Sequence, residues 1–215
     1  SYIDATYLER ERRVACRYRL GTEVTLWPFD VAAAEYIPAP GPLQALGLST
    51  DHRVLSGLRL TLTHRTSADP EQEPTAAQAL KTPTSWFAGC RCKELSVHLL
   101  GAEADAVALY EQLFGDCVGI YFRHLDEFGD PVITPADGVA LEQLGFGEDE
   151  ALLPADTRVF RGFDLLRELF WFPRKFLGLR LSGLARIMPK LTAKTVDVIF
   201  VFDEVNTRLA AAVQK

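Results

Sequence analysis

The sequence predicts an α+β fold, with mostly antiparallel strands and two helices packed on them, and it allows a division into two subdomains. Three segments carry this prediction. Leucines alternate with polar residues within residues 53–63, apolar residues recur at helical spacing within residues 106–114, and residues 196–202 are apolar on both faces. A composition of 48% hydrophobic and 24% charged residues is typical of a globular chain with a buried core.

The first part of the chain, residues 1–90, is expected to be rich in strands. Residues 14–37 read as extended, and their apolar positions change phase after Pro28. Such a change indicates a bulge or a sheet edge, because proline cannot donate a hydrogen bond to the ladder. A cleaner strand follows at residues 53–63, with its leucines on one face. Residues 67–84 are polar, proline-rich and aperiodic, and we expect a mobile surface loop there.

The second part, residues 91–215, is expected to form strand-helix-strand and then helix-strand-strand-helix. The patterns predict, in order, a strand at 95–99, a helix at 106–114, a strand at 118–122, a helix at 162–172, strands at 176–181 and 196–202, and a closing helix at 206–214. Apolar residues cover half the circumference of the second of these helices. We therefore expect Phe163, Phe170 and Phe172 to lie in the core.

The charge and the cysteines exclude several classes of function. The net charge is −6, and an acidic chain gains nothing from counterion release on nucleic acid, so nucleic acid is not an expected partner. No apolar run has membrane-spanning length, so membrane insertion is not expected. Cys16, Cys90, Cys92 and Cys117 have neither the spacing of a disulfide scaffold nor that of a zinc finger, which favours reduced cytoplasmic thiols.

No residue pattern predicts a catalytic, cofactor or metal site. The chain lacks a nucleophile elbow, and its four histidines are not paired at metal-ligand spacing. The acidic cluster at residues 148–150 lacks the alternating carboxylates of a calcium loop, which favours a solvated turn or a salt-bridge acceptor for a partner. A small enzyme or ligand-binding domain that uses Cys90, Cys92 or this acidic turn is kept as an alternative.

Trp171 is the residue most suggestive of a protein interface. On the helical projection it falls among charged positions, one turn from Arg167, where a cation–π contact would be available. A tryptophan on a polar helix face is either covered by another segment of its own chain or left for a partner. We predict a protein interface formed by Arg167, Trp171, Arg174 and Lys175.

Residues 149–154 read Asp-Glu-Ala-Leu-Leu-Pro, and residues 162–177 match the pattern "G-[FY]-x-L-L-x-E-[FY]-F-x-F-P-x-K-F-L" at every specified position except Leu169. These two segments resemble the TssF family, a component of the baseplate of the bacterial type VI secretion system. Shorter resemblances occur in the family's order at 25–28 (Thr-Leu-Trp-Pro), 58–62 (Leu-Arg-Leu-Thr-Leu) and 109–114 (Leu-Tyr-Glu-Gln-Leu-Phe).

This resemblance spans most of residues 13–203 and implies a non-enzymatic role without a cofactor. The chain resembles the middle portion of a structural wedge subunit that assembles through protein–protein contacts at the cytoplasmic face of the inner membrane. The implied partners are a TssG-like wedge subunit, a second copy of the protein and other baseplate subunits. Relative to the family, the charge is reversed at Arg174 and Arg180. A phage-tail baseplate protein of the same architecture is a further alternative.

Overall fold

The computed structural model describes the following residues: 2–9, 12–19, 21, 25–65, 86–153, 160 and 162–213. The loop expected at 67–84 lies outside them. The chain forms two compact units, the first of Ser1–Leu26 with Gln143–Phe176 and the second of Trp27–Glu142 with Leu177–Lys215. Strands from both sides of residue 90, where the sequence suggests a division, pair in one sheet.

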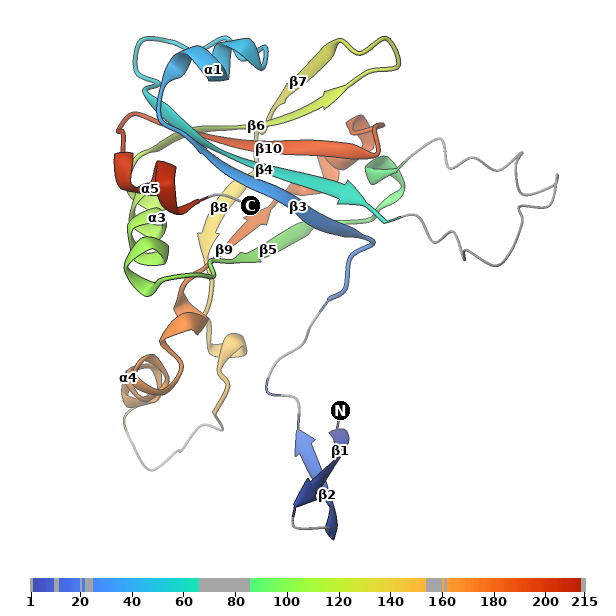
Figure 1. Cartoon of the computed structure of the whole chain (residues 1–215), viewed down its shortest axis with the longest axis vertical. Helices are drawn as coiled ribbons and strands as arrows, with labels where there is room; N and C mark the ends of the chain where they lie inside the picture. Colours follow the sequence, from blue (N-terminus) through green and yellow to red (C-terminus); the bar gives the residue numbers. More distant parts are fainter. Residues whose placement is uncertain are drawn as a thin grey trace, which may run out of the picture. The chain divides into compact units, whose positions relative to one another are not determined.

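The second unit is built on a five-stranded sheet in the order β3-β4-β10-β6-β7, in which every neighbouring pair is antiparallel (Figure 1). Its strands are β3 (Phe29–Ile37), β4 (Ser56–His64), β6 (Cys117–Leu125), β7 (Pro131–Pro135) and β10 (Thr195–Phe202). Strand β10 lies in the middle, and every residue after Thr195 is buried. The α+β class and the strand covered on both faces are thereby confirmed.

Strand β3 lies at the edge of this sheet and contains a bulge between Val31 and Ala33. This agrees with the phase change after Pro28. The alternating run before that proline is not a strand over its described residues, 25–28, and pairing begins only at Phe29. The proline has no N–H group for a ladder, so the strand starts after it.

Different helices pack against the two faces of the five-stranded sheet. Helices α3 (Glu103–Gly115) and α5 (Thr207–Ala212) contribute to the larger core, which takes in alternate residues of β4 and β10. A short helix that the sequence did not predict, α1 (Pro40–Ala45), contributes Leu43 to the smaller core on the other face, with Ile199 and Val201 of β10. Proline at the start of α1 suits a helix, because its missing N–H would be unpaired there in any case.

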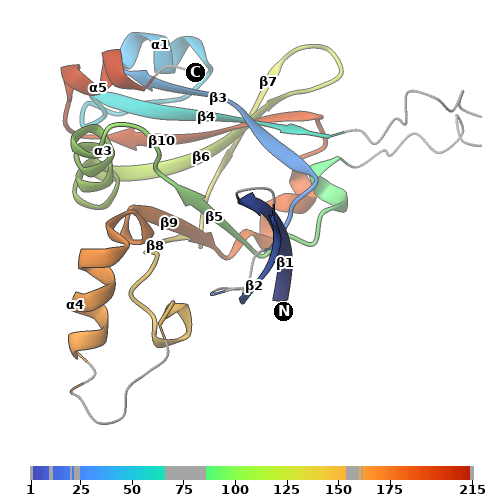
Figure 2. The ribbon, with the colours of Figure 1, turned by 60° about the horizontal axis from the view of Figure 1, so that its bottom comes forward.

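A second sheet of three strands lies beneath the first (Figure 2). Its order is β5-β9-β8, with β5 (Glu94–His98), β9 (Gly178–Ser182) and β8 (Ala140–Gln143). Its leucines Leu95, Leu179 and Leu181 complete the larger core. The predicted strand-helix-strand segment is present as β5, α3 and β6. Its two strands nevertheless belong to different sheets, and α3 links them.

The first unit contains a hairpin and a helix. Strand β1 (Tyr2–Glu9) pairs antiparallel with β2 (Arg12–Arg19), and α4 covers Gly162–Trp171, as the sequence predicts within one residue. The expected strand start at Phe176 is wrong. A 3₁₀ turn, η3, occupies Pro173–Phe176, and β9 begins at Gly178. The additional turn brings Lys175 back toward α4, where it pairs with a carboxylate.

Candidate protein interface

Helix α4 presents its apolar side chains to solvent and its acidic side chain to the interior. Its one buried residue is Glu168, which is 2% exposed. The exposed large apolar residues on and beside the helix are Phe160, Phe163, Leu165, Leu166, Leu169, Phe170, Trp171 and Phe172. Phe170 is the most exposed of them, at 82%. The expectation that Phe163, Phe170 and Phe172 lie in the core is therefore wrong. We refer to these eight residues as the α4 surface.

Hydrogen bonding to Glu168 explains why the polar side of the helix faces inward. Its Oε1 accepts the backbone N–H groups of Leu152 and Leu153, each at 2.8 Å, and its Oε2 accepts the ammonium of Lys175. Burial raises the pKa of Glu168, but the bond from Lys175 and the two N–H groups outweigh it, so the pKa lies below its ordinary value. A buried carboxylate with three donors is stable where an unpaired one would not be. We call this arrangement the Glu168 clamp.

The acidic turn ahead of α4 serves the backbone of its own loop. Oε2 of Glu150 accepts the N–H of Gly145 at 2.8 Å and the N–H of Gly147 at 3.0 Å. These bonds close the loop around the 3₁₀ turn η2 (Glu148–Glu150). The expectation of a solvated turn, or of a salt-bridge acceptor for a partner, does not hold for Glu150, because its carboxylate is occupied within the loop.

The same loop packs closely on the turn that follows α4. Gly145 has φ +95°, and a Cβ atom at this position would lie 2.9 Å from the carbonyl oxygen of Lys175. The ring of Phe146 lies 5.0 Å from that of Phe176, centre to centre. Glycine is required at this close approach. The loop, α4 and the turn after it are therefore held together at several points, and the α4 surface stands on a fixed support.

The four residues predicted as an interface have different surroundings. Trp171 is 64% exposed, and Arg174, three residues further along the chain, is also exposed. Arg167 donates to Asp164 at 3.0 Å, one turn back along the helix. The Lys175 side chain is only 11% exposed and belongs to the Glu168 clamp. The exposure of the phenylalanines was not predicted from the sequence, because an apolar helical stripe is ordinarily a sign of core packing.

The thiols considered as an alternative site lack the properties of a reactive pair. Burial raises the pKa of Cys90, and burial together with the neighbouring Cys90 raises the pKa of Cys92 to about 12. Protonated thiols are weak nucleophiles and weak metal ligands. Within the part of the chain that the structure describes, no group of three or more His, Cys, Asp or Glu side chains could hold a metal ion.

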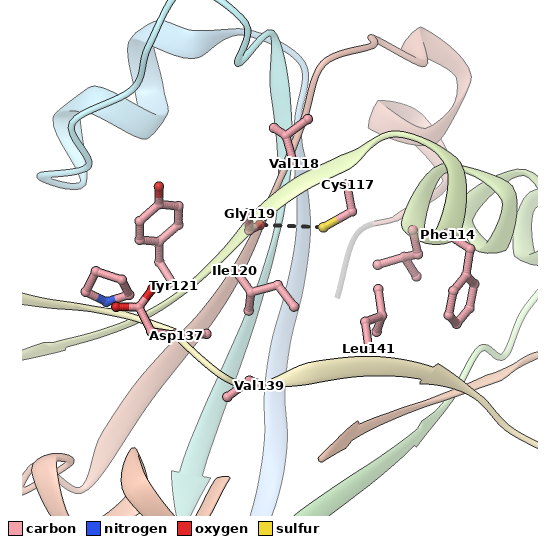
Figure 3. A pocket seen from close by; sticks show the side chains of 12 residues that line it. Phe114, Cys117, Val118, Gly119, Ile120, Tyr121, Asp137, Val139 and Leu141 are labelled. Carbon is pink, nitrogen blue, oxygen red and sulfur yellow. Dashed lines mark hydrogen bonds between the residues drawn. The ribbon is translucent and has the colours of Figure 1, made fainter. Parts of the chain in front are cut away.

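A shallow cavity of about 500 Å³ lies in the second unit, beside α3, β6 and the segment at 135–141 (Figure 3). Phe114 and Leu141 form one end of it, and Tyr121 and Asp137 lie toward the other. The Cys117 thiol donates to a backbone carbonyl at 3.5 Å, and burial raises its pKa. No pair of titratable side chains converges among the residues that line this cavity.

None of the helices that the structure describes combines the length and the apolar composition that crossing a bilayer requires.

Comparisons with known proteins agree on one family. The family model described as "Type VI secretion system, TssF" matches residues 1–215. The chain is 29% identical over 201 residues to the type VI secretion system component TssF1 of Pseudomonas aeruginosa, covering 94% of this chain and 29% of that protein. It also shares a fold, with a TM-score of 0.59 and 20% identity, with a chain of a TssK-TssF-TssG baseplate subcomplex determined by cryo-electron microscopy. That match covers 89% of this chain and 30% of the other, so the chain spans about a third of the length of these relatives or less.

Proposed function

Because the chain belongs to the TssF family of the type VI secretion system, we propose that it is part of a structural wedge subunit of the baseplate and that the α4 surface binds a partner subunit. The observation that carries this proposal is the orientation of α4, which buries Glu168 and exposes six large apolar side chains, with Phe160 and Phe172 exposed beside its two ends. Contiguous exposed apolar patches on soluble proteins mark interaction sites. The role is assembly rather than catalysis, at the cytoplasmic face of the inner membrane.

The proposed occupant of the α4 surface is a TssG-like subunit. The solved relative is a chain of a TssK-TssF-TssG baseplate subcomplex, and the present chain belongs to the TssF family, so TssK-like and TssG-like subunits are the natural partners to test. Phe163, Phe170 and Trp171 are the anchors, because large aromatic side chains dominate the energy of protein interfaces. Arg167 and Arg174 lie at the polar margin. Lys175 supports the surface through the Glu168 clamp rather than by touching the partner.

The Glu168 clamp adds to the expected affinity by fixing the surface before binding. An interface that is already ordered loses less conformational entropy when the partner arrives. Burial of one large apolar side chain stabilises by about 1.5–3 kcal/mol, so three anchors contribute about 5–9 kcal/mol against a cost of association of about 4–15 kcal/mol, and the other apolar residues of the surface must supply the remainder. A second copy of the protein and other baseplate subunits are proposed to join the same assembly through further surfaces.

Affinity capture with a co-expressed TssG-like subunit tests the proposal. Trp171→Ala is expected to weaken capture by about 30-fold, which corresponds to an interface anchor worth about 2 kcal/mol. Its thermal unfolding should match that of the unchanged protein, because Trp171 is 64% exposed. The control is Phe128→Ala, which removes an 83% exposed ring from the turn between β6 and β7. If Trp171→Ala and Phe128→Ala are captured equally well, the α4 surface does not bind the TssG-like subunit.

A further inference from the structure

A basic surface lies in the second unit. Residues 86–93 and 183–195 together contain five Lys or Arg residues and no Asp or Glu. The five are Arg91, Lys93, Arg186, Lys190 and Lys194, and all are exposed. The whole chain has a net charge of −6, so these two segments run against its overall sign. We call these five side chains the basic surface.

The two segments lie side by side, although about 90 residues separate them in the sequence. The N–H of Ala88 donates to the carbonyl of Leu191 at 3.0 Å, and the N–H of Leu184 donates to the carbonyl of Lys93 at 2.9 Å. Both ribbons lie together at one end of the sheets of the second unit (Figures 1 and 2). The five cations therefore belong to one continuous part of the protein.

The backbone beneath the basic surface is firmly anchored. Three 3₁₀ turns, η1 (Phe87–Gly89), η4 (Leu184–Arg186) and η5 (Met188–Lys190), form the two segments together with their connections. Their apolar side chains insert into the larger core and are almost fully buried: Phe87, Leu184, Ile187, Met188 and Leu191. The apolar residues point inward and the cations point outward, so the positive charges are presented on a fixed support.

The charges of this surface are not neutralised by the chain itself in the part that the structure describes. There, no carboxylate oxygen lies within 4.0 Å of a side-chain nitrogen of any of the five residues. Two acidic residues on adjoining strands are engaged elsewhere. Glu94 faces Arg180 at 3.9 Å, and Asp30 pairs with Arg65. A cluster of like charges without counterions repels itself, and an anionic partner relieves that repulsion.

We propose that the basic surface binds an acidic segment of a partner protein. The ammonium of Lys194 lies 5.7 Å from the ring centre of the half-buried Trp86, so an aromatic face adjoins the cations and can receive an apolar side chain. A peptide segment offers both carboxylates and such a side chain. Nucleic acid and anionic membranes extend far beyond five cations and would meet the net negative charge of the remaining chain.

This inference does not depend on the α4 surface. The two surfaces lie in different compact units and have opposite chemistry, one apolar and one cationic. A protein that joins several subunits needs separate contacts for them. Variants of Trp171 are therefore expected to leave binding at the basic surface unchanged, so the two proposals can fail separately.

The test is a fluorescence titration of the protein with a labelled decapeptide of alternating glutamate and alanine, closed by a tryptophan. Binding is expected at 50 mM salt and should weaken at least about tenfold at 500 mM, because added salt screens exposed charges. The double variant Lys190→Glu/Lys194→Glu should lose about tenfold or more in affinity. The control Arg53→Glu/Arg208→Glu changes the net charge equally at two other exposed sites and should bind as the unchanged protein does.

Two further probes distinguish the class of partner. A ten-nucleotide thymidine strand and vesicles of phosphatidylglycerol are titrated under the same conditions. Weaker binding of both than of the peptide supports the proposal, and tighter binding of either overturns it. Equal peptide affinities in the two double variants would also overturn it, because attraction would then follow the net charge alone. Circular dichroism of each variant confirms that folding is retained.

Discussion

Replacing Glu168 by leucine should open the loop before α4 while leaving the second unit intact. The change removes the one acceptor that three donors share, namely the N–H groups of Leu152 and Leu153 and the ammonium of Lys175. The Lys175 side chain is 11% exposed and would lose its counterion. Leaving one partner of a buried ion pair alone typically costs 3–5 kcal/mol. We take about 3 kcal/mol, because the ammonium can turn toward solvent.

Hydrogen exchange of single amides measures this cost where it arises. An opening free energy lower by about 3 kcal/mol accelerates exchange roughly 100-fold. The amides of Leu152, Leu153 and α4 should show this acceleration, and those of β10 should not. The control is Glu111→Leu, which removes an exposed carboxylate from α3. Unchanged exchange at Leu152 and Leu153 would refute the clamp.

A second variant separates the ion pair from the bonds to the backbone. If the clamp is cooperative, the double variant Glu168→Leu/Lys175→Met should lower the free energy of opening by less than the sum of the two single changes, because it leaves no unpaired charge. The coupling is expected at about 1–3 kcal/mol. Strict additivity would show that Lys175 and Glu168 act independently, despite their contact.

Two further predictions concern the second unit. His124 is buried, and burial lowers its pKa, although Asp126 partly opposes this. The unfolded imidazole, with an ordinary pKa of about 6.5, therefore takes up a proton more readily than the folded one, so stability should fall as pH drops below about 6.5, by up to about 1.4 kcal/mol per pH unit, until the folded imidazole is protonated as well. The urea midpoint of His124→Leu should lack this dependence on pH. The Asp197 carboxylate accepts hydrogen bonds from the Thr61 hydroxyl at 2.7 Å and from the Arg123 guanidinium at 2.9 Å. Asp197→Ala leaves Arg123 without its counterion and should lower the free energy of unfolding by about 3–5 kcal/mol. The double variant Asp197→Leu/Arg123→Met leaves no unpaired charge and should lower it less in the same urea titration.

The sequence predicts best those helices and strands whose apolar positions are the ones that the fold buries. Strand β10 is apolar on both faces and is buried on both, and α3 buries the stripe that its spacing indicates. Periodicity says nothing about which strands pair, so the separation of β5 and β6 into two sheets could not be foreseen. Helix α1 escaped prediction because six residues that include two prolines carry no helical period.

For α4 the sequence predicts the bounds of the helix correctly, but it predicts the wrong side of the helix to be buried. An apolar stripe shows that one side of a helix avoids water, but it does not say whether the same chain or another one supplies the cover. Orientation here is decided by Glu168, whose burial is favourable only because Lys175 and two backbone N–H groups arrive from distant positions. Three-dimensional contacts of this kind cannot be read from helical spacing.

The two segments by which the sequence resembles the TssF family are the same two that the Glu168 clamp joins. The first, at 149–154, supplies the backbone N–H groups, and the second, at 162–177, supplies Glu168 and Lys175. The motif therefore has a structural meaning: it fixes the helix with Glu168 inward, and the apolar residues of the motif that lie on α4 are left facing out. If the α4 surface binds a partner, one short stretch of chain specifies both the contact and the support that holds it in place. Loss of the clamp should then weaken partner capture even though Glu168 itself is 2% exposed and cannot be a principal contact.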